Sequence, residues 1–453
     1  MNTIYDVCAI ELARKLNSFT KVFPCSKGAN EMIAYLVSEN TLGDFLCTAG
    51  ECGFIKVSEN IDEKHIFYIL ESKRERMYVL YLKSCEELKL IWENIEKLPA
   101  TDTYREGEVK VLQLGIGNYG KHTDNPMVGM GYIIKLANSH AIIVDGGYDT
   151  EGCADNLFAS LERLEIARNK ERFIIDAWYI THLDGDHIGI LKSFFSKYSD
   201  NVSVGSFVQN FQVGDPAINE YNYKQVGDDY ITLMESACPD AKVITAHPSC
   251  VFNYAGASIR ILYTAEMYYS LFSRLMDGND ASLIFMLETD GRKMLFMGDG
   301  GEVSARCLYS AYGKDTLKCD VLQVPHHGLT TGHMVFKRPM SEHAYLNRIY
   351  EYASPDFAAM PMGETFNPYR DCYGNNQRKF VLENYPQDGY FIDKSRVDMG
   401  YDGINVICSP KDGGKVLTTY MMSSDREPMA TVFSFGKDGV SVEFNDTLSS
   451  FLS

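Results

Sequence analysis

The sequence lacks long apolar runs, paired cysteines and a secretion signal. No stretch approaches the roughly 20 uninterrupted apolar residues of a membrane-spanning helix, and the first residues have neither the basic start nor the apolar run of a signal peptide. The 12 cysteines include no CxxC pair, which excludes zinc-ribbon spacing, and are too sparse over 453 residues for a disulfide scaffold. We therefore expect a soluble cytoplasmic protein with reduced thiols and no membrane partner.

Positive charge is also in short supply. Lys and Arg number 43 against 61 Asp and Glu, which gives a formal net charge of −18. A protein that coats nucleic acid gains its affinity from a basic face that neutralises phosphates, so the net charge does not favour nucleic acid as a partner, although a local basic face could still bind it. The balance fits a small or neutral substrate, or an anionic one held by metal ions. No feature points to an oligomeric state.

The composition is that of a globular protein, with 45% hydrophobic and 23% charged residues. At 453 residues the chain can hold one large catalytic unit and a smaller appended one. A polar stretch without periodicity, near residues 99–108, marks a boundary. We predict a small α+β accessory domain over residues 1–104 and a larger domain over residues 105–453 that ends in a β extension.

The accessory domain shows no catalytic cluster. Apolar spacing predicts helices at residues 4–16, 29–37 and 85–98, and strands at residues 65–70 and 77–82. Substrate selection, dimerisation and partner docking are all compatible with such a domain.

From Val109 onward, short apolar strands repeatedly end in polar clusters. The predicted strands are residues 109–114, 132–136, 141–144, 173–180, 258–263, 282–288, 293–297, 321–324, 403–408, 416–421, 430–435 and 440–444. One helix is predicted at residues 154–168. Strands that end in Asp and His, with helices between them, indicate a layered α/β or αββα core.

The densest polar cluster is the run from His182 to His187, in which Asp184 and Asp186 are the other potential ligands. Four such residues within six positions is unusual in a chain with only 10 His. A lone His is more often a packed side chain, but carboxylates behind an apolar strand are costly unless a cation meets them. Imidazole and carboxylate suit zinc, manganese or iron. A tight turn at Gly185 can aim the first two residues at one ion and the last two at a second.

Residues 181–189 resemble the HxHxDH signature of the metallo-β-lactamase superfamily, in the variant whose second His is Asp. That variant is typical of the hydrolase domain in the competence DNA-uptake (ComEC) group. Further segments resemble that group in the same order: residues 144–147, 279–283, 295–299, 320–328, 373–376 and 402–403. The resemblance covers roughly residues 109–410 and implies an αββα sandwich, the metallo-β-lactamase fold.

The resemblance also implies a site with two divalent metal ions, zinc or manganese. The candidate ligands are His182, Asp184, Asp186, His187, Asp299, His326 and His327. The candidate catalytic residues are Asp145, Asp186, His326 and His327. Asp299 would bridge the ions, and Asp145 would orient the loop that carries the signature. One of the two adjacent histidines would bind metal, and the other would stabilise an oxyanion or protonate the leaving group.

One departure from the family concerns a further histidine ligand, usually found between the signature and the Gly-Asp motif. The only candidate is His247, which precedes an apolar run at residues 251–254 instead of ending an obvious strand. His333 is a further candidate proton donor, with an ordinary surface histidine as the alternative. Residues 115–120 imitate a phosphate-binding loop, but no helix clearly follows, so we interpret them as a turn.

Two metal ions that share a water create a nucleophile near neutral pH. We expect a metallohydrolase that acts on a phosphodiester, in nucleic acid or a nucleotide. A small-molecule ester or lactone hydrolase is the alternative, because one fold hosts many reactions. A third hypothesis is a non-catalytic binding module, in which the metal only organises the loops.

Overall fold

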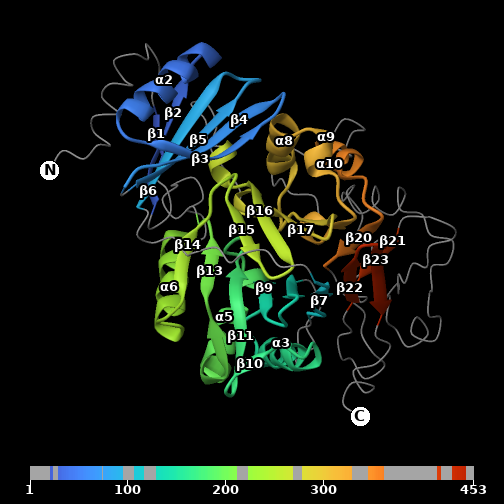
Figure 1. Ribbon diagram of the computed structural model, residues 1–453. Helices are drawn as coiled ribbons and strands as arrows, with labels where there is room; N and C mark the ends of the chain where they lie inside the picture. The colour runs from blue at the N-terminus through green and yellow to red at the C-terminus, as the bar shows by residue number, and fades with distance from the viewer. Residues whose placement is uncertain are drawn as a thin grey trace.

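The structure is a computed structural model, in which the described strands form three β-sheets (Figure 1). It describes residues 21–23, 29–73, 75–94, 107–116, 129–211, 223–268, 278–328, 345–361, 416–419 and 431–444. Among these residues, no helix has the length and apolar character needed to cross a bilayer.

The N-terminal sheet has six antiparallel strands in the order β1-β2-β6-β5-β4-β3. Its elements are β1 (Lys21–Phe23), β2 (Ala29–Leu36), α2 (Glu39–Glu51), β3 (Ile55–Ile61), β4 (His65–Glu71), β5 (Glu75–Leu82) and β6 (Glu87–Asn94). The strands predicted at 65–70 and 77–82 are confirmed as β4 and β5. The helix predicted at 4–16 lies outside the described residues.

The helices predicted at 29–37 and 85–98 are wrong, because these segments form β2 and β6. Both faces of β6 are covered: Leu88 and Leu90 belong to the core beneath α2, whereas Ile91 belongs to the core on the other side. A strand buried on both faces loses its alternation and can imitate helical spacing. The described helix of this unit is α2, which lies between β2 and β3. It begins after the N-cap Ser38, whose Oγ accepts from the Thr41 amide at 3.3 Å.

The second sheet follows the order β14-β13-β11-β9-β8-β7-β22-β23, with β10 and β12 paired to β11. Its strands are β7 (Val109–Gln113), β8 (Gly131–Lys135), β9 (Ala141–Asp145), β10 (Arg168–Asn169), β11 (Arg172–Tyr179), β12 (Val202–Val204), β13 (Ser206–Gln209), β14 (Lys242–Thr245), β22 (Thr431–Gly436) and β23 (Gly439–Phe444). Helices α3 (Glu151–Arg163), α5 (Ile190–Tyr198) and α6 (Tyr223–Ala237) cover its outer face.

The third sheet has the order β15-β16-β17-β18-β19-β20-β21. Its strands are β15 (Val251–Tyr254), β16 (Ala257–Tyr263), β17 (Ile284–Thr289), β18 (Arg292–Phe296), β19 (Val321–Gln323), β20 (Phe357–Met360) and β21 (Val416–Thr419). Helices α7 (Ala265–Tyr268), α8 (Glu302–Ala311), α9 (Lys314–Leu317) and α10 (Tyr345–Ala353) accompany this sheet.

The second and third sheets form a sandwich with helices on both outer faces. Along β9, Ile142 and Val144 pack into the core shared with the third sheet, whereas Ala141 and Ile143 pack into the core beneath α3 and α5. The structure is thus an αββα sandwich beside a small N-terminal α+β unit, which confirms the predicted fold class, the metallo-β-lactamase fold. The predicted boundary at residues 104 and 105 falls outside the described residues.

The topology places polar strand ends together. Strands β9 and β11 run parallel in one sheet, and β18 and β19 run parallel in the other. The carboxyl ends of parallel strands meet at one edge of a sheet. Asp145 ends β9, His182 follows β11, Asp299 follows β18 and His327 follows β19. His182 from one sheet and His327 from the other both lie within 4 Å of the Asp299 carboxylate, at 3.9 and 3.4 Å, so both sheets present these side chains to the same edge of the sandwich.

Candidate metal centre

The signature loop leaves β11 and turns directly into a short helix. Asp184 has an extended backbone at the N-cap of α4 (Gly185–Ile188), so Asp186 and His187 lie in the first turn. This turn folds the segment back on itself and brings the rings of His182 and His187 to 4.2 Å between centroids. Both imidazoles are buried, at 2% and 0% exposure.

Asp145 holds this loop from below. It is fully buried, and its Oδ1 accepts from the backbone amide of Thr181 at 2.8 Å. Its Oδ2 accepts from the Thr181 hydroxyl at 2.7 Å and lies 2.9 Å from His187 Nδ1. Its backbone φ of 52° is left-handed, and its carbonyl accepts from Trp178 Nε1 at 2.8 Å. Asp145 therefore joins the start of the loop, at Thr181, to His187.

Two histidines face each other through their Nε2 atoms. His187 Nε2 lies 3.2 Å from His327 Nε2. His187 Nδ1 faces the Asp145 carboxylate, and His327 Nδ1 lies 2.6 Å from the carbonyl oxygen of Pro361. Because both partners are acceptors, each neutral ring carries its proton on Nδ1 and a lone pair on Nε2. Two lone pairs at this distance repel each other unless a cation lies between them.

His182 presents its Nε2 in the same way. The Thr181 hydroxyl donates to Asp145, so its oxygen accepts from His182 Nδ1 at 3.0 Å. His182 Nε2 is buried and has no hydrogen-bond partner among the described residues. An unsatisfied buried nitrogen beside carboxylates is costly and is the arrangement expected of a metal ligand.

Asp299 lies between the histidines. Its Oδ1 is 3.2 Å from His187 Nε2, and its Oδ2 is 3.4 Å from His327 Nε2 and 3.9 Å from His182 Nε2. The backbone places it there through Gly298, whose φ of 54° favours glycine, and through Ser282 Oγ, which accepts from the Asp299 amide at 3.0 Å. This position suits a carboxylate that bridges two cations.

Two overlapping sets of ligand atoms are each close enough to hold an ion, and they share His187. One consists of His182, His187 and Asp299, and the other of Asp186, His187 and His327, with all ligand atoms of a set within 4.8 Å. The carboxylates and imidazoles fit zinc, manganese or iron. The donor chemistry and the lone pairs that face inward therefore fit the metal pair that the sequence predicts.

The adjacent histidines of the closing motif occupy different places. His327 is buried, and its Nε2 lies 3.3 Å from Asp186 Oδ2. His326 is 18% exposed, and its Nε2 is 3.7 Å from Asp299 Oδ2. Both have left-handed backbones, with φ of 52° and 49°, and residues other than glycine adopt this conformation at a cost. The geometry therefore favours His327 as the ligand and leaves His326 at the rim.

Asp184 lies at the mouth of the site. Its side chain is 35% exposed, and its Oδ2 is 3.6 Å from His182 Nε2. It belongs to neither of the two close ligand sets, and a water molecule could link such an exposed carboxylate to an ion.

The electrostatics of the cluster favour a bound cation. Burial alone would lower the pKa of His327, but the Asp299 and Asp186 carboxylates raise it to about 9. Burial opposes ionisation of Asp299, yet the neighbouring His187, His327 and His326 hold its pKa well below the usual range. The carboxylates thus stay ionised, and a metal ion must displace protons from the histidines.

His247 lies apart from this cluster. It comes two residues after β14, a strand that the sequence analysis missed, and its Nδ1 lies 2.9 Å from the Glu266 carboxylate. It belongs to neither ligand set of the described residues. His333, residues 117–120, 373–376 and 402–403 lie outside the described residues, so the predictions for them stay predictions.

Sequence reasoning missed Gln323 as a support of the site. It is fully buried, its Oε1 accepts from the Met297 amide at 2.7 Å, and its Nε2 donates to the Gly298 carbonyl at 3.1 Å. It thus fixes the turn that carries Asp299. A buried amide within an apolar strand, just before the two adjacent histidines, was the available signal.

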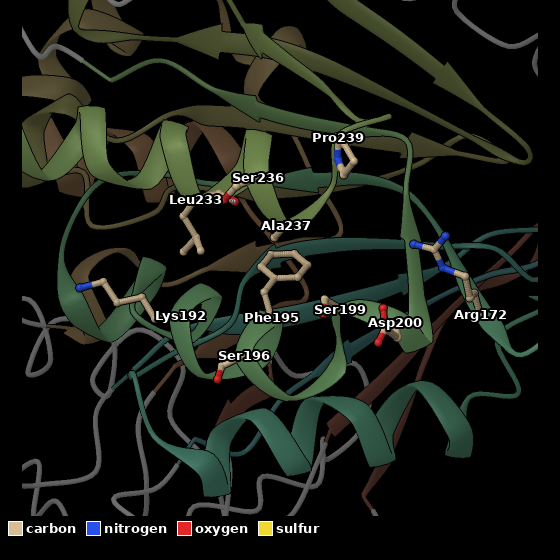
Figure 2. A pocket seen from close by; sticks show the side chains of 10 residues that line it. All are labelled: Arg172, Lys192, Phe195, Ser196, Ser199, Asp200, Leu233, Ser236, Ala237 and Pro239. Atoms are coloured by element: carbon tan, nitrogen blue, oxygen red, sulfur yellow. Dashed lines mark hydrogen bonds between the residues drawn. The ribbon is translucent and has the colours of Figure 1, made fainter.

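A cavity of about 600 Å³ lies elsewhere, between α5 and α6. Figure 2 shows Lys192 and Arg172 at its two ends and Phe195 between them. None of the metal-centre residues lines it.

Comparison with known proteins finds no matching family model and no matching curated protein. Among solved structures, the metallo-β-lactamase fold protein YhfI from Bacillus subtilis is 15% identical, with 61% of this chain and 93% of that chain covered and a TM-score of 0.36. CmlA, a diiron β-hydroxylase from Streptomyces venezuelae, is 14% identical, with 59% and 45% covered and a TM-score of 0.31. This chain thus spans less than half of CmlA. Because these TM-scores are low, the similarities say nothing about the reaction, which we infer from the side chains of this chain alone.

Proposed function

We propose that this protein is a metal-dependent hydrolase with a binuclear centre, and that its substrate is a phosphodiester. The observation that carries the proposal is the convergence of His182, His187 and His327, whose Nε2 lone pairs point at the Asp299 carboxylate from two different sheets. In the neutral rings, three Nε2 lone pairs surround an ionised carboxylate, and a bound cation stabilises that arrangement.

Each side chain then has a role. His182, Asp184 and Asp299 would hold one ion, and Asp186, His187, Asp299 and His327 the other. Two ions held there would lower the pKa of a shared water and neutralise charge that develops on a phosphoryl oxygen. Asp145 keeps His187 in the tautomer that leaves Nε2 free. His326, whose side chain is 18% exposed at the rim, would give a proton to the leaving oxygen.

A phosphodiester is the preferred substrate because two adjacent divalent ions would neutralise the charge of its phosphoryl oxygens, which the formal net charge of −18 would otherwise repel. Only a strong local cation makes that approach favourable, and two divalent ions supply it. A small ester or lactone remains the second candidate, since its carbonyl could use the same ions. The carboxylate-rich ligand set also suits manganese, a common partner of phosphoryl oxygens.

The test compares wild type with Asp186→Ala and with a matched control, Asp176→Ala. The Asp186 side chain is 23% exposed and pairs with His327; the Asp176 side chain is 24% exposed and pairs with His140 at 2.8 Å, away from the strand ends that carry the centre. Elemental analysis should find two ions in wild type and control, and fewer in Asp186→Ala. Hydrolysis of bis(p-nitrophenyl) phosphate with Mn²⁺ or Zn²⁺ should follow the metal content.

The alternatives predict different results. Bound metal with turnover of aryl esters or lactones, but not of the diester, would support the second candidate. Metal without any turnover would support a binding module. Absence of metal from wild type would overturn the proposal.

A further inference from the structure

The N-terminal sheet shares a hydrophobic core with the sandwich. Phe67 and Leu80 of the sheet pack in the same cluster as Ala305 and Leu308 of α8. Figure 1 shows α8 beside the end of the sheet where β3 and β4 meet. A separately folding accessory module would bury its core alone and touch its neighbour through a smaller and more polar surface.

The turn between β3 and β4 contacts the C-terminal end of α8. Lys64 Nζ donates to the carbonyl oxygens of Tyr309 at 2.7 Å and Tyr312 at 2.9 Å. His65 Nδ1 lies 2.5 Å from the carbonyl oxygen of Ala311. The last carbonyls of a helix lack internal partners and carry partial negative charge, which a lysine complements. The N-terminal unit thus supplies partners to three carbonyl groups at the C-terminal end of α8, two in its last turn and one at its C-cap.

The other end of α8 is tied to the metal centre. Asp299 precedes the helix by only three residues, and Gly301 is its N-cap. The intervening turn is tight: the Gly300 amide donates to the Met297 carbonyl at 3.0 Å, and a Cβ on Gly300 would lie 2.6 Å from Ser304 Oγ. Because a helix is stiff over this length, a shift of its C-terminal end is transmitted to the turn that carries Asp299.

We infer that Lys64 is a positioning residue for Asp299, acting through α8, and that the N-terminal sheet is a fixed support of the catalytic centre. The inference about function rests on the proposed metal centre. A second lysine, which is buried, supports the same arrangement: Lys89, 1% exposed on β6, donates to the carbonyl oxygen of Met267 in α7. The sheet therefore holds two helices of the sandwich through their backbone carbonyls.

The experiment uses the full chain with Lys64→Met, the milder Lys64→Gln and the conservative Lys64→Arg. Lys83→Met is the control, because Lys83 lies beside the same turn but donates to the Asp62 carbonyl within the N-terminal unit. Amide hydrogen exchange should become about tenfold faster over residues 298–311 in Lys64→Met, with a smaller effect in Lys64→Gln. Mn²⁺ affinity, measured by calorimetry, should fall several-fold in the same order. Lys64→Arg should restore both.

Unchanged exchange over residues 298–311 in a folded Lys64→Met protein would overturn the inference, as would equal effects of Lys83→Met. Faster exchange with unchanged Mn²⁺ affinity would reduce Lys64 to a structural cap and overturn the positioning role. If wild type binds no Mn²⁺, the proposed function fails, while the exchange data still decide whether the sheet holds α8.

Discussion

The substitution Asp145→Asn should weaken metal binding without removing any ligand. Asparagine has the shape of aspartate and tolerates a left-handed backbone such as the φ of 52° at this position. Its remaining oxygen can still accept from the Thr181 amide. Its NH₂ group, however, would face two donors, the Thr181 hydroxyl and His187 Nδ1–H, where Asp145 Oδ2 accepts from both.

The magnitude follows from those two lost bonds. Each hydrogen bond to a charged group contributes about 1.5–3 kcal/mol, so the loss of two should lower the free energy of unfolding by about 3–6 kcal/mol. His187 can escape the clash by moving its proton to Nε2, the atom that faces Asp299 at 3.2 Å. That tautomer cannot bind a metal ion. Loss of such an orienting partner typically reduces metal affinity by about 10–100-fold.

Urea unfolding of the metal-free protein measures the first quantity, and calorimetric titration with Mn²⁺ or Zn²⁺ measures the second. Asp176→Asn is the control, because this carboxylate also pairs with a histidine, His140 at 2.8 Å. An Asp145→Asn protein that is folded and binds metal as tightly as wild type would refute the assigned tautomers, and with them the argument from inward lone pairs.

Three further predictions follow from the same geometry. His326→Ala should keep both ions by elemental analysis yet lower kcat by about 10²-fold or more, because the proton donor at the rim is lost; loss of metal instead would place His326 among the ligands. In the metal-free protein, the raised pKa of His327, about 9 in the folded state, stabilises the fold fully below its unfolded value near 6.5 and ceases to do so as pH rises through 9; urea midpoints should fall over that window, and a flat profile would contradict the shift. Gln323→Leu should leave the Met297 amide unpaired, remove one of the two donors to the Gly298 carbonyl and lower the free energy of unfolding by about 1–3 kcal/mol; a change below 0.5 kcal/mol by urea titration would show that the turn does not depend on this amide.

The sequence predicts the sandwich better than the N-terminal unit. In the sandwich, strands such as β9 and β11 are apolar runs that end in Asp145 and His182, so composition and motif point to the same boundaries. In the N-terminal sheet, β2 and β6 are covered on both faces, by α2 and by the sandwich, and this tertiary burial removes the alternation by which a strand is recognised.

The motif predicts which types of side chain gather at the site, but it does not predict which of them face the proposed metal ions. Sequence alone could not separate His326 from His327, since the choice depends on which imidazole the Pro361 carbonyl holds in place, 34 residues further along the chain. His247 was left open for a similar reason: its partner, Glu266, is brought to it by β15, β16 and the start of α7. Such pairings depend on tertiary packing that no local pattern records.

The paired Nε2 atoms of His187 and His327 belong to residues 140 positions apart in the chain. Neither sheet alone holds a complete ligand set, so the proposed ions would bind only after the two sheets have docked. A metal ion that binds only the docked sheets would stabilise the native state, and this stabilisation would grow with the logarithm of the free ion concentration. The concentration of free metal would then determine how often the protein unfolds and is exposed to proteolysis. At low metal concentration the protein would still fold but would be less stable and degraded sooner.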